Sequence, residues 1–269
     1  MLRQRLNSSL LLWSILLLIV WCFKLNAIAF LCVLTAVGAV IELLKLFKAD
    51  APVIRFNACL AGLFLAFSYV GLRHEIFDSD HVYALALAVL FHWSVFVAKT
   101  AKALFLSLFC FFYLTLNIHF LFKIAHLFLW NDTTATLTIL WVVLITKATD
   151  IGAFCVGCSC GKHPLLPIVS PKKTREGVLG GILSALSVNV LFYVCFAKYM
   201  PILFIKSCVF TVCLAWGAVL SDLVESLLKR HLAVKDSGRV IPGIGGILDL
   251  VDSLLLNAPL AYWLLKYGV

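Results

Sequence analysis

Charged residues are scarce in this chain of 269 residues, because Asp, Glu, Lys and Arg together make up only 13% of it. Soluble domains contain about a quarter charged residues, and the hydrophobic share here is 63%. These proportions exclude an ordinary soluble domain. The chain also lacks an internal repeat, a low-complexity tract and a Walker A glycine-lysine loop, so nucleotide chemistry on such a loop is excluded as well.

Hydrophobic runs divide the chain into about nine spans long enough to cross a bilayer. We therefore expect an all-α polytopic membrane protein, with N-terminal transmembrane helices in residues 1–130 and a second transmembrane region with two charged loops in residues 131–269. The first run resembles a signal peptide with Ala27-Ile28-Ala29 as cleavage site, but a second run follows at once, so we expect an uncleaved helix. The expected spans are residues 8–24, 26–47, 57–73, 81–98, 103–122, 134–153, 177–197, 203–227 and 252–267.

Basic residues outnumber acidic ones by 22 to 13, which gives a formal net charge of +9. With a cytoplasmic N-terminus, most lysines and arginines fall in loops on the cytoplasmic side, as the positive-inside rule requires. The basic excess therefore indicates topology, and we expect no nucleic-acid partner. The same topology places loops 154–176 and 228–251 on the cytoplasmic face of the cell membrane, where we expect the functional site.

Most of the ten cysteines lie in apolar spans, where free cysteine behaves as a small hydrophobic residue. No disulfide framework is expected. The exception is the run Cys155-x2-Cys158-x-Cys160-x2-His163, whose side chains are of the types that bind zinc. All four would come from one short segment, whereas zinc motifs pair separated ligand knuckles, so we favour no zinc site here.

The polar half of the chain begins at Lys147 and Asp150, which lie one helical turn apart. This spacing is typical of an intrahelical ion pair, but ionisable groups within a membrane span also mark functional sites, and both interpretations stay open. The following loop contains Ser170, Lys172 and Lys173 beside a proline. Cations next to hydroxyl groups suit a phosphate clamp; the alternative is a basic loop attracted to anionic lipid.

A stripe of polar residues marks the eighth expected span, where Asp222, Glu225, Ser226 and Lys229 have the spacing of one helical face. A membrane helix with such a stripe is expected to turn it toward a bundle interior or a polar cavity.

The next span begins with a second pair of acidic residues, Asp249 and Asp252, just after Gly245 and Gly246. Two helices with such pairs could converge on one hard cation through oxygen ligands, as magnesium requires. The glycines and the free N–H groups of the helix start could receive a phosphate. The structural alternative is that the aspartates cap the helix, which leaves Asp222 in the preceding span unexplained.

The segment from Ser226 to Asp252 resembles the signature of the phosphatidate cytidylyltransferases, also called CDP-diacylglycerol synthases. The positions in register are Ser226, Lys229, Arg230, Lys235, Asp236, Gly238, Ile241, Pro242, Gly245, Gly246, Ile247, Asp249 and Asp252. Earlier matches are Asp150 to Phe154, Gly161 to His163, Ser170 to Thr174 and Glu176-Gly177, so the resemblance covers roughly residues 147–257. Two positions depart, because Ile244 replaces a histidine and Leu250 replaces an arginine of the family.

The resemblance implies transfer of CMP from CTP to phosphatidic acid by direct displacement, giving CDP-diacylglycerol and pyrophosphate in phospholipid biosynthesis. It makes residues 131–269 the catalytic region and Mg²⁺ the cofactor, with a second, monovalent cation left open. The implied metal ligands are Asp222, Asp249 and Asp252, and the other catalytic residues are Asp236 and Lys229. The implied substrate-binding residues are Ser170, Lys172, Lys173, Arg230, Lys235, Gly245 and Gly246.

Two other functions stay open at this point. A transporter could carry acidic groups within its spans, although here the polar groups concentrate in the C-terminal half. Another metal-dependent lipid phosphotransferase would also use membrane aspartates, but the Asp-Gly-x2-Ala-Arg pattern of the CDP-alcohol enzymes is absent. The expected partners are CTP, phosphatidic acid and the lipid bilayer, with a homodimer left open.

Overall fold

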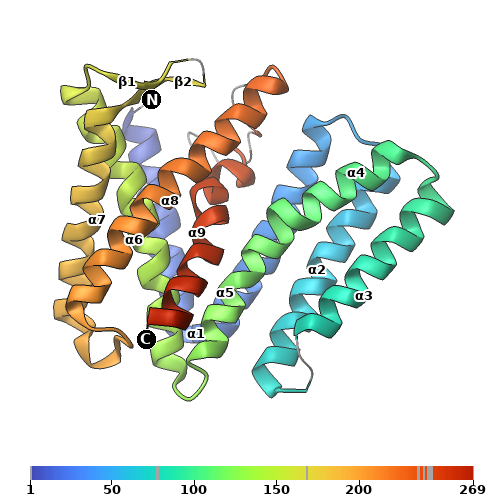
Figure 1. Cartoon of the computed structure of the whole chain (residues 1–269), viewed down its shortest axis with the longest axis horizontal. Coiled ribbons are helices and arrows are strands. Elements are labelled where there is room, and N and C mark those ends of the chain that lie inside the picture. Colours follow the sequence, from blue (N-terminus) through green and yellow to red (C-terminus); the bar gives the residue numbers. More distant parts are fainter. Residues whose placement is uncertain are drawn as a thin grey trace. The chain divides into compact units, whose positions relative to one another are not determined.

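The computed structural model describes residues 2–76, 79–167, 169–234, 237–238, 240 and 245–268, and these residues are mostly helical (Figure 1). The all-α class predicted from the sequence is confirmed, apart from one two-stranded hairpin. The helices are α1 (Leu2–Leu46), α2 (Ala51–His74), α3 (Ser79–His92), α4 (Ala101–Cys110), α5 (Leu116–Leu127), α6 (Asp132–Cys160), α7 (Arg175–Phe196), α8 (Phe204–His231) and α9 (Ile247–Gly268). The shorter elements are η1 (Trp93–Ala98), η2 (Phe111–Thr115), η3 (Ala197–Tyr199), β1 (Pro164–Leu166) and β2 (Ser170–Thr174).

Eight helical segments of the described residues are long and apolar enough to cross a membrane, one fewer than the sequence predicts. The difference lies in α1, which covers the spans expected at residues 8–24 and 26–47. Within α1, Lys24 has the non-helical backbone angles φ 49° and ψ −127°, so the helix is broken where the two expected spans meet. The protein is an integral membrane protein, and a cytoplasmic N-terminus stays a prediction.

Contacts group the chain into two compact units, each of which combines two segments. The first unit comprises Met1–Leu129 and Asp236–Val251, and the second comprises Trp130–Lys235 and Asp252–Val269. The boundary falls within α9, whose first residues are grouped with the first unit. The division predicted between residues 130 and 131 stays a prediction.

Side-chain caps explain where several helices start. Asn131 accepts the N–H groups of Thr133 and Thr134 at 3.0 and 3.4 Å and begins α6. Thr174 accepts the N–H of Gly177 at 3.1 Å and begins α7. Each oxygen satisfies a donor that lacks a partner within its own helix.

In the first unit, α2 packs against α1, α3 and α5. Asn57 on α2 donates a hydrogen bond of 2.8 Å to Ser107 on α4. His119 on α5 is fully buried, with its ring centroid 5.4 Å from that of Phe64 and 5.2 Å from that of Tyr83. This imidazole is therefore part of an aromatic core.

In the second unit, α6 packs closely along α7, and both contact α8. A Cβ atom at Gly181 would lie 2.8 Å from the carbonyl oxygen of Thr149, so the contact depends on a residue without a side chain. A chain of buried hydrogen bonds joins the three helices: Trp141 Nε1 donates to Asn189 Oδ1 at 2.8 Å, and Asn189 Nδ2 donates to Ser207 Oγ at 3.1 Å.

Substituting Gly152 tests the close approach of α6 and α7. A Cβ atom there would lie 2.4 Å from Ser184 Cβ and 2.7 Å from the carbonyl oxygen of Gly180. We expect Gly152→Ala to lower the free energy of unfolding by roughly 1–3 kcal/mol, because the helices must separate. The measurement is thermal unfolding in detergent. Gly62→Ala is the matched control, since its Cβ would approach only a side-chain atom of Val37 at 3.3 Å; equal effects of the two variants would refute this account.

The basic loop predicted after α6 forms a short antiparallel hairpin in which Pro164 lies opposite Thr174. The sequence did not predict strands there, because proline and lysine are both uncommon in strands. The backbone pairing holds β2 extended, and Lys172 and Lys173 are neighbours on that strand. Successive side chains of a strand point to opposite faces, so the two lysines have different surroundings.

Candidate functional site

Three carboxylates of the second unit come together, Asp222 and Glu225 from α8 and Asp252 from α9. One oxygen atom of each lies within 4.8 Å of the others. The two α8 residues share one helical face, as their spacing predicts, and Glu225 is only 1% exposed. Oxygen donors gathered this closely have the chemistry that magnesium requires. We call these three residues the carboxylate cluster.

Lysines compensate the charge of the carboxylate cluster. Carboxylates this close repel one another, and buried charges are tolerated only when they are paired. The three pairs join Lys173 to Asp222 at 2.6 Å, Lys229 to Glu225 at 2.8 Å and Lys147 to Asp252 at 4.0 Å. The three lysines come from β2, α8 and α6, and Lys147 is shared with a fourth carboxylate, Asp150, at 3.2 Å.

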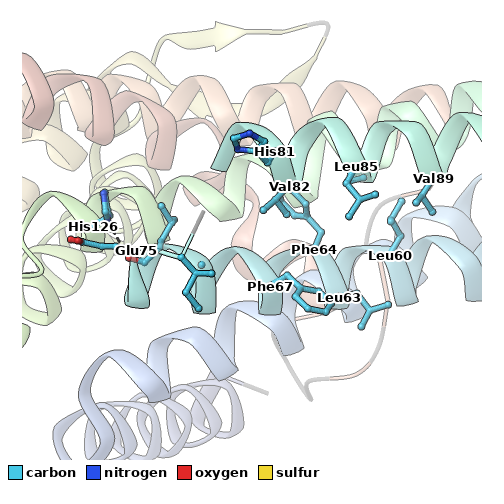
Figure 2. Close-up of a pocket in the computed structure, with 14 residues that line it drawn as sticks. Leu60, Leu63, Phe64, Phe67, Glu75, His81, Val82, Leu85, Val89 and His126 are labelled. Carbon is cyan, nitrogen blue, oxygen red and sulfur yellow. Dashed lines mark hydrogen bonds between the residues drawn. The ribbon is translucent and has the colours of Figure 1, made fainter. Parts of the chain in front are cut away.

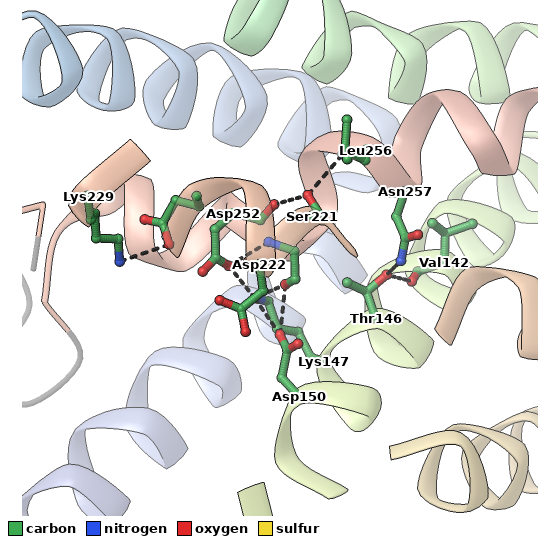
Figure 3. Close-up of polar contacts among 12 residues, drawn as sticks. Val142, Thr146, Lys147, Asp150, Ser221, Asp222, Lys229, Asp252, Leu256 and Asn257 are labelled. Carbon is green, nitrogen blue, oxygen red and sulfur yellow. Dashed lines mark hydrogen bonds and ion pairs between the residues drawn. The ribbon is translucent and has the colours of Figure 1, made fainter. Parts of the chain in front are cut away.

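Lys147 also organises a hydrogen-bonded network beside the cluster (Figure 3). Its ammonium group lies 3.2 Å from Asp150 Oδ2, which is the intrahelical pair that the spacing suggested. It also donates to Ser253 Oγ on α9 at 2.8 Å, and that hydroxyl donates to Asp150 Oδ2 at 2.7 Å. Lys147 and Asp150 therefore form the expected intrahelical pair, and this pair also lies beside the carboxylate cluster.

Further hydrogen bonds fix this part of α9 against its neighbours in the second unit (Figure 3). Ser221 on α8 donates to the carbonyl oxygen of Asp252 and accepts the N–H of Leu256 at 3.2 Å. Asn257 donates to Thr146 on α6 at 2.9 Å. These hydrogen bonds fix α9 against α8 and α6, the helices that carry or adjoin the carboxylate cluster.

Asp249, the other predicted metal ligand on α9, has different surroundings in the first unit. Its Oδ2 atom accepts the N–H of Gly246 at 2.7 Å and that of Ser237 at 3.1 Å, so the carboxylate caps the helix start. The next two N–H groups of α9 are donated to the buried Glu42. The N–H groups at the start of α9, which were expected to bind a phosphate, therefore donate to the carboxylates of Asp249 and Glu42. The role of Asp249 as a metal ligand stays a prediction.

The other predicted substrate-binding residues fall in three places. Lys172 and Arg230 are exposed, and Ser170 is half-buried at the start of β2. Gly245 has a φ of 126°, a conformation that L side chains rarely adopt, so glycine is required there by the backbone. Two predicted residues, Lys235 and Asp236, and the family departure Ile244 lie outside the described residues.

Among the described residues, the side chains at the cysteine-rich end of α6 are not gathered into a group of three metal-ligating residues. Its three thiols are exposed, and none belongs to a group of three metal-ligating side chains: Cys155, Cys158 and Cys160. His163 Nδ1 lies 2.5 Å from Glu176 Oε1 instead. Ser159 occupies the centre of a Gly-x-Ser-x-Gly run, but it lies within α6 and donates to the Cys155 carbonyl oxygen at 2.9 Å. A nucleophile elbow requires a strand-to-helix turn, so we assign no nucleophile here.

A pocket of about 1080 Å³ lies in the first unit, lined mainly by apolar residues of α2 and α3 (Figure 2). Leu60, Phe64 and Leu85 are typical of its walls, and Glu75 and His126 lie together toward one end. Such walls suit hydrocarbon and offer a triphosphate almost no cationic donors. This pocket therefore does not suit the nucleotide that the sequence resemblance implies.

Several residues of these sites cannot be identified from the sequence. The sequence predicts Glu225 on a polar helical face but not among the implied metal ligands, and it gives no prediction for Ser253 or Glu42. A lone carboxylate in an apolar helix was the available signal for Glu42, because such a group must find partners inside the membrane. Nothing in the spacing identifies Ser253, since its partners come from a helix about a hundred residues away.

Several curated proteins similar to this chain carry the same name. The protein named phosphatidate cytidylyltransferase of Bacillus subtilis (strain 168) is 34% identical over 219 residues, which cover 81% of this chain and 71% of the relative. Proteins of the same name from Staphylococcus haemolyticus (strain JCSC1435) and Staphylococcus aureus (strain COL) are 45% and 46% identical over 124 residues, which are 45% of this chain. Each of these two matches spans about half the length of the relative, at 46%.

A family model described as the cytidylyltransferase family matches residues 3–268 and so includes both compact units. The match extends well beyond the region of residues 147–257 in which the sequence resemblance was found. Together with the Bacillus relative, it shows that the chain belongs to the cytidylyltransferase family, whose members are nucleotidyltransferases.

Proposed function

We propose that this protein transfers CMP from CTP to phosphatidic acid, forming CDP-diacylglycerol and pyrophosphate in phospholipid biosynthesis. The observation that carries the proposal is the carboxylate cluster with its three lysines, in a chain whose relatives are named for this activity. Membership of an enzyme family decides against the transporter alternative. The intact aspartates and lysines favour an active enzyme despite Ile244 and Leu250.

In the proposed reaction, a phosphate oxygen of phosphatidic acid attacks the α-phosphorus of CTP. One P–O bond forms there, the bond to the oxygen bridging toward the β-phosphorus breaks, and pyrophosphate leaves with the bonding electrons. No covalent intermediate with the protein is needed. The protein has to bring two anionic reactants together and balance the charge that moves to the leaving group.

The donor set of the carboxylate cluster fits a magnesium ion, because three carboxylate oxygens lie within 4.8 Å of one another. We propose that Asp222, Glu225 and Asp252 hold Mg²⁺, which when bound supplies positive charge next to the reacting phosphates. Asp249 remains a predicted further ligand, and a second, monovalent cation remains a prediction as well.

The lysines can then change partners. With a divalent cation among the carboxylates, the ammonium groups of Lys173 and Lys229 are no longer needed to balance Asp222 and Glu225. Both side chains are flexible point charges with three donors each. We propose that they turn to the phosphates of the substrates, while Lys147 keeps its contacts with Asp150 and Ser253 and holds the framework in place.

The positive-inside distribution supports a site that faces the cytoplasm of the cell membrane. CTP would then enter from the cytosol, and the phosphate of the lipid would lie at the interface. The basic residues of β2 are suited to attract both anions to the same place.

The direct test is an assay of the purified protein in detergent with labelled CTP, phosphatidic acid and Mg²⁺. We expect labelled CDP-diacylglycerol and one pyrophosphate for each lipid converted. Absence of the product under conditions where the Bacillus subtilis relative forms it would overturn the proposal.

A lysine substitution tests the role of β2. We expect Lys173→Ala to raise the KM for CTP roughly tenfold, because a charged hydrogen bond to phosphate is lost. Lys206→Ala is the matched control, since Lys206 is also in the second unit but donates to the carbonyl oxygen of Gly268. The same change of KM in both variants would count against phosphate binding by Lys173.

A further inference from the structure

Glu42 is a buried carboxylate in α1, in the part of the chain to which the sequence resemblance does not extend. Its side chain is 8% exposed, and the neighbouring Val40, Leu43 and Leu44 are fully buried. A carboxylate in such surroundings is costly unless its oxygens accept hydrogen bonds. The contacts of Glu42 therefore indicate why this position carries an acid.

Both oxygens of Glu42 are used at the start of α9, within the same compact unit. Oε1 accepts the N–H of Ile247 at 2.9 Å, and Oε2 accepts the N–H of Leu248 at 2.9 Å and the hydroxyl of Ser237 at 3.2 Å. The first N–H groups of a helix have no partner within it and carry partial positive charge. Glu42 thus caps α9 from a helix about two hundred residues earlier in the sequence.

Asp249 completes this arrangement. It accepts the N–H of Gly246, the residue just before α9, and the N–H of Ser237. The N–H groups at the start of α9 therefore donate either to Glu42 or to Asp249. Ser237 contacts both residues, because its N–H donates to Asp249 and its hydroxyl donates to Glu42. Any shift of the turn that releases Glu42 would also change the direction of the Asp249 side chain.

Two glycines of the family signature leave room for Glu42. A Cβ atom at Gly238 would lie 2.6 Å from Glu42 Oε1, and one at Gly246 would lie 2.4 Å from Glu42 Oε2. From the sequence, Gly246 was expected to leave room for a substrate phosphate, whereas Gly238 had no expected role. In the structure, their missing side chains admit a carboxylate of the protein itself.

We propose that Glu42 is a positioning residue, which fixes the first turn of α9 and with it Ser237 and the signature residues Gly246 and Asp249. The inference rests on the proposed cytidylyl transfer for its kinetic consequence. Its structural part concerns the hydrogen bonds of Ile247 and Leu248 and does not depend on any activity.

The test uses Glu42→Gln in the full-length protein, with two readouts. Hydrogen exchange of the peptide that contains residues 246–256 is expected to accelerate about tenfold, because an amide presents one acceptor oxygen in place of two. In the CTP assay, we expect kcat to fall roughly 10- to 100-fold and the Mg²⁺ concentration for half-maximal rate to rise, as when a residue that orients a ligand is lost. A merely structural role would lower the active fraction and leave the half-maximal Mg²⁺ concentration unchanged.

Thr35→Val is the matched control, since Thr35 is also on α1 but its hydroxyl bonds to the carbonyl oxygens of Leu31 and Cys32 in its own helix. Wild-type exchange and wild-type Mg²⁺ dependence in Glu42→Gln would overturn the inference. An inactive wild-type protein would instead refute the proposed function, while the exchange experiment would still decide the role of Glu42.

A second variant keeps the inference testable if Glu42→Gln fails to fold. In Gly238→Ala, the added methyl group would lie 2.6 Å from Glu42 Oε1, so this variant is expected to give the same two changes. In the double variant Gly238→Ala with Glu42→Asp, the side chain at position 42 is shorter by one methylene, which leaves room for the added methyl group. Part of the kcat lost in Gly238→Ala should therefore return. Wild-type behaviour of Gly238→Ala would contradict the proposed contact.

Discussion

Asp222→Asn is expected to lower the rate of CDP-diacylglycerol formation about a thousandfold, which corresponds to about 4 kcal/mol of activation free energy. Asp222 contributes one of the three oxygens gathered within 4.8 Å and pairs with Lys173 at 2.6 Å. An amide carries no charge and binds a hard cation poorly, so the transition state loses much of its charge compensation. The measurement is kcat over a titration of Mg²⁺.

The fold should survive this substitution, because Asp222 and Lys173 are both only partly buried and the repulsion among three crowded carboxylates is relieved. We therefore expect thermal unfolding in detergent close to that of the wild type. Asp132→Asn provides the matched control, since Asp132 lies in the first turn of α6, away from the cluster in sequence. Retention of more than a tenth of the wild-type rate in Asp222→Asn would contradict the assignment of the site.

Lys147→Met is expected to destabilise the protein by roughly 3 kcal/mol and to abolish most of the activity. The substitution removes the ammonium group that lies 3.2 Å from Asp150, 2.8 Å from Ser253 and 4.0 Å from Asp252. Two carboxylates then lose their nearest cation, which is costly in a partly buried site. Thermal unfolding and the CTP assay measure the two effects.

The double variant Lys147→Met with Asp150→Asn should recover part of the lost stability, because it removes one of the uncompensated charges. A double-mutant cycle gives the coupling between the two side chains. Lys198→Met is the control, since Lys198 is exposed and its ammonium group lies 6.0 Å from the ring centroid of Tyr199. Strictly additive losses for Lys147 and Asp150 would show that the network is not coupled as described.

Hydropathy and spacing predicted most of the architecture, because both depend on properties that act along the chain. A span of apolar residues must satisfy its backbone polar groups internally and becomes a helix whatever its neighbours are. The same holds for the shared face of Asp222 and Glu225, which follows from helical periodicity. The break at Lys24 was correctly placed between two expected spans, although these meet within one helix assignment.

The hairpin and its lysines could not be predicted in the same way. Pairing of β1 with β2 needs backbone partners across a turn, and hydropathy carries no signal for it. That Lys173 reaches Asp222 while its neighbour Lys172 is exposed depends on this pairing. From the sequence alone, Lys172 and Lys173 had the same expected role in phosphate binding.

Asp249 and Asp252 show most clearly what the sequence determined and what it left to the tertiary structure. The sequence alone determined a membrane protein of helical spans, an acidic pair at the start of the last helix and a resemblance to one enzyme family. Only the tertiary structure decided that Asp249 caps its helix together with Glu42, while Asp252 joins Asp222 and Glu225. The reason is physical: helical periodicity specifies which side chains share a face, but the partners of a carboxylate are set by whichever segments pack against that face.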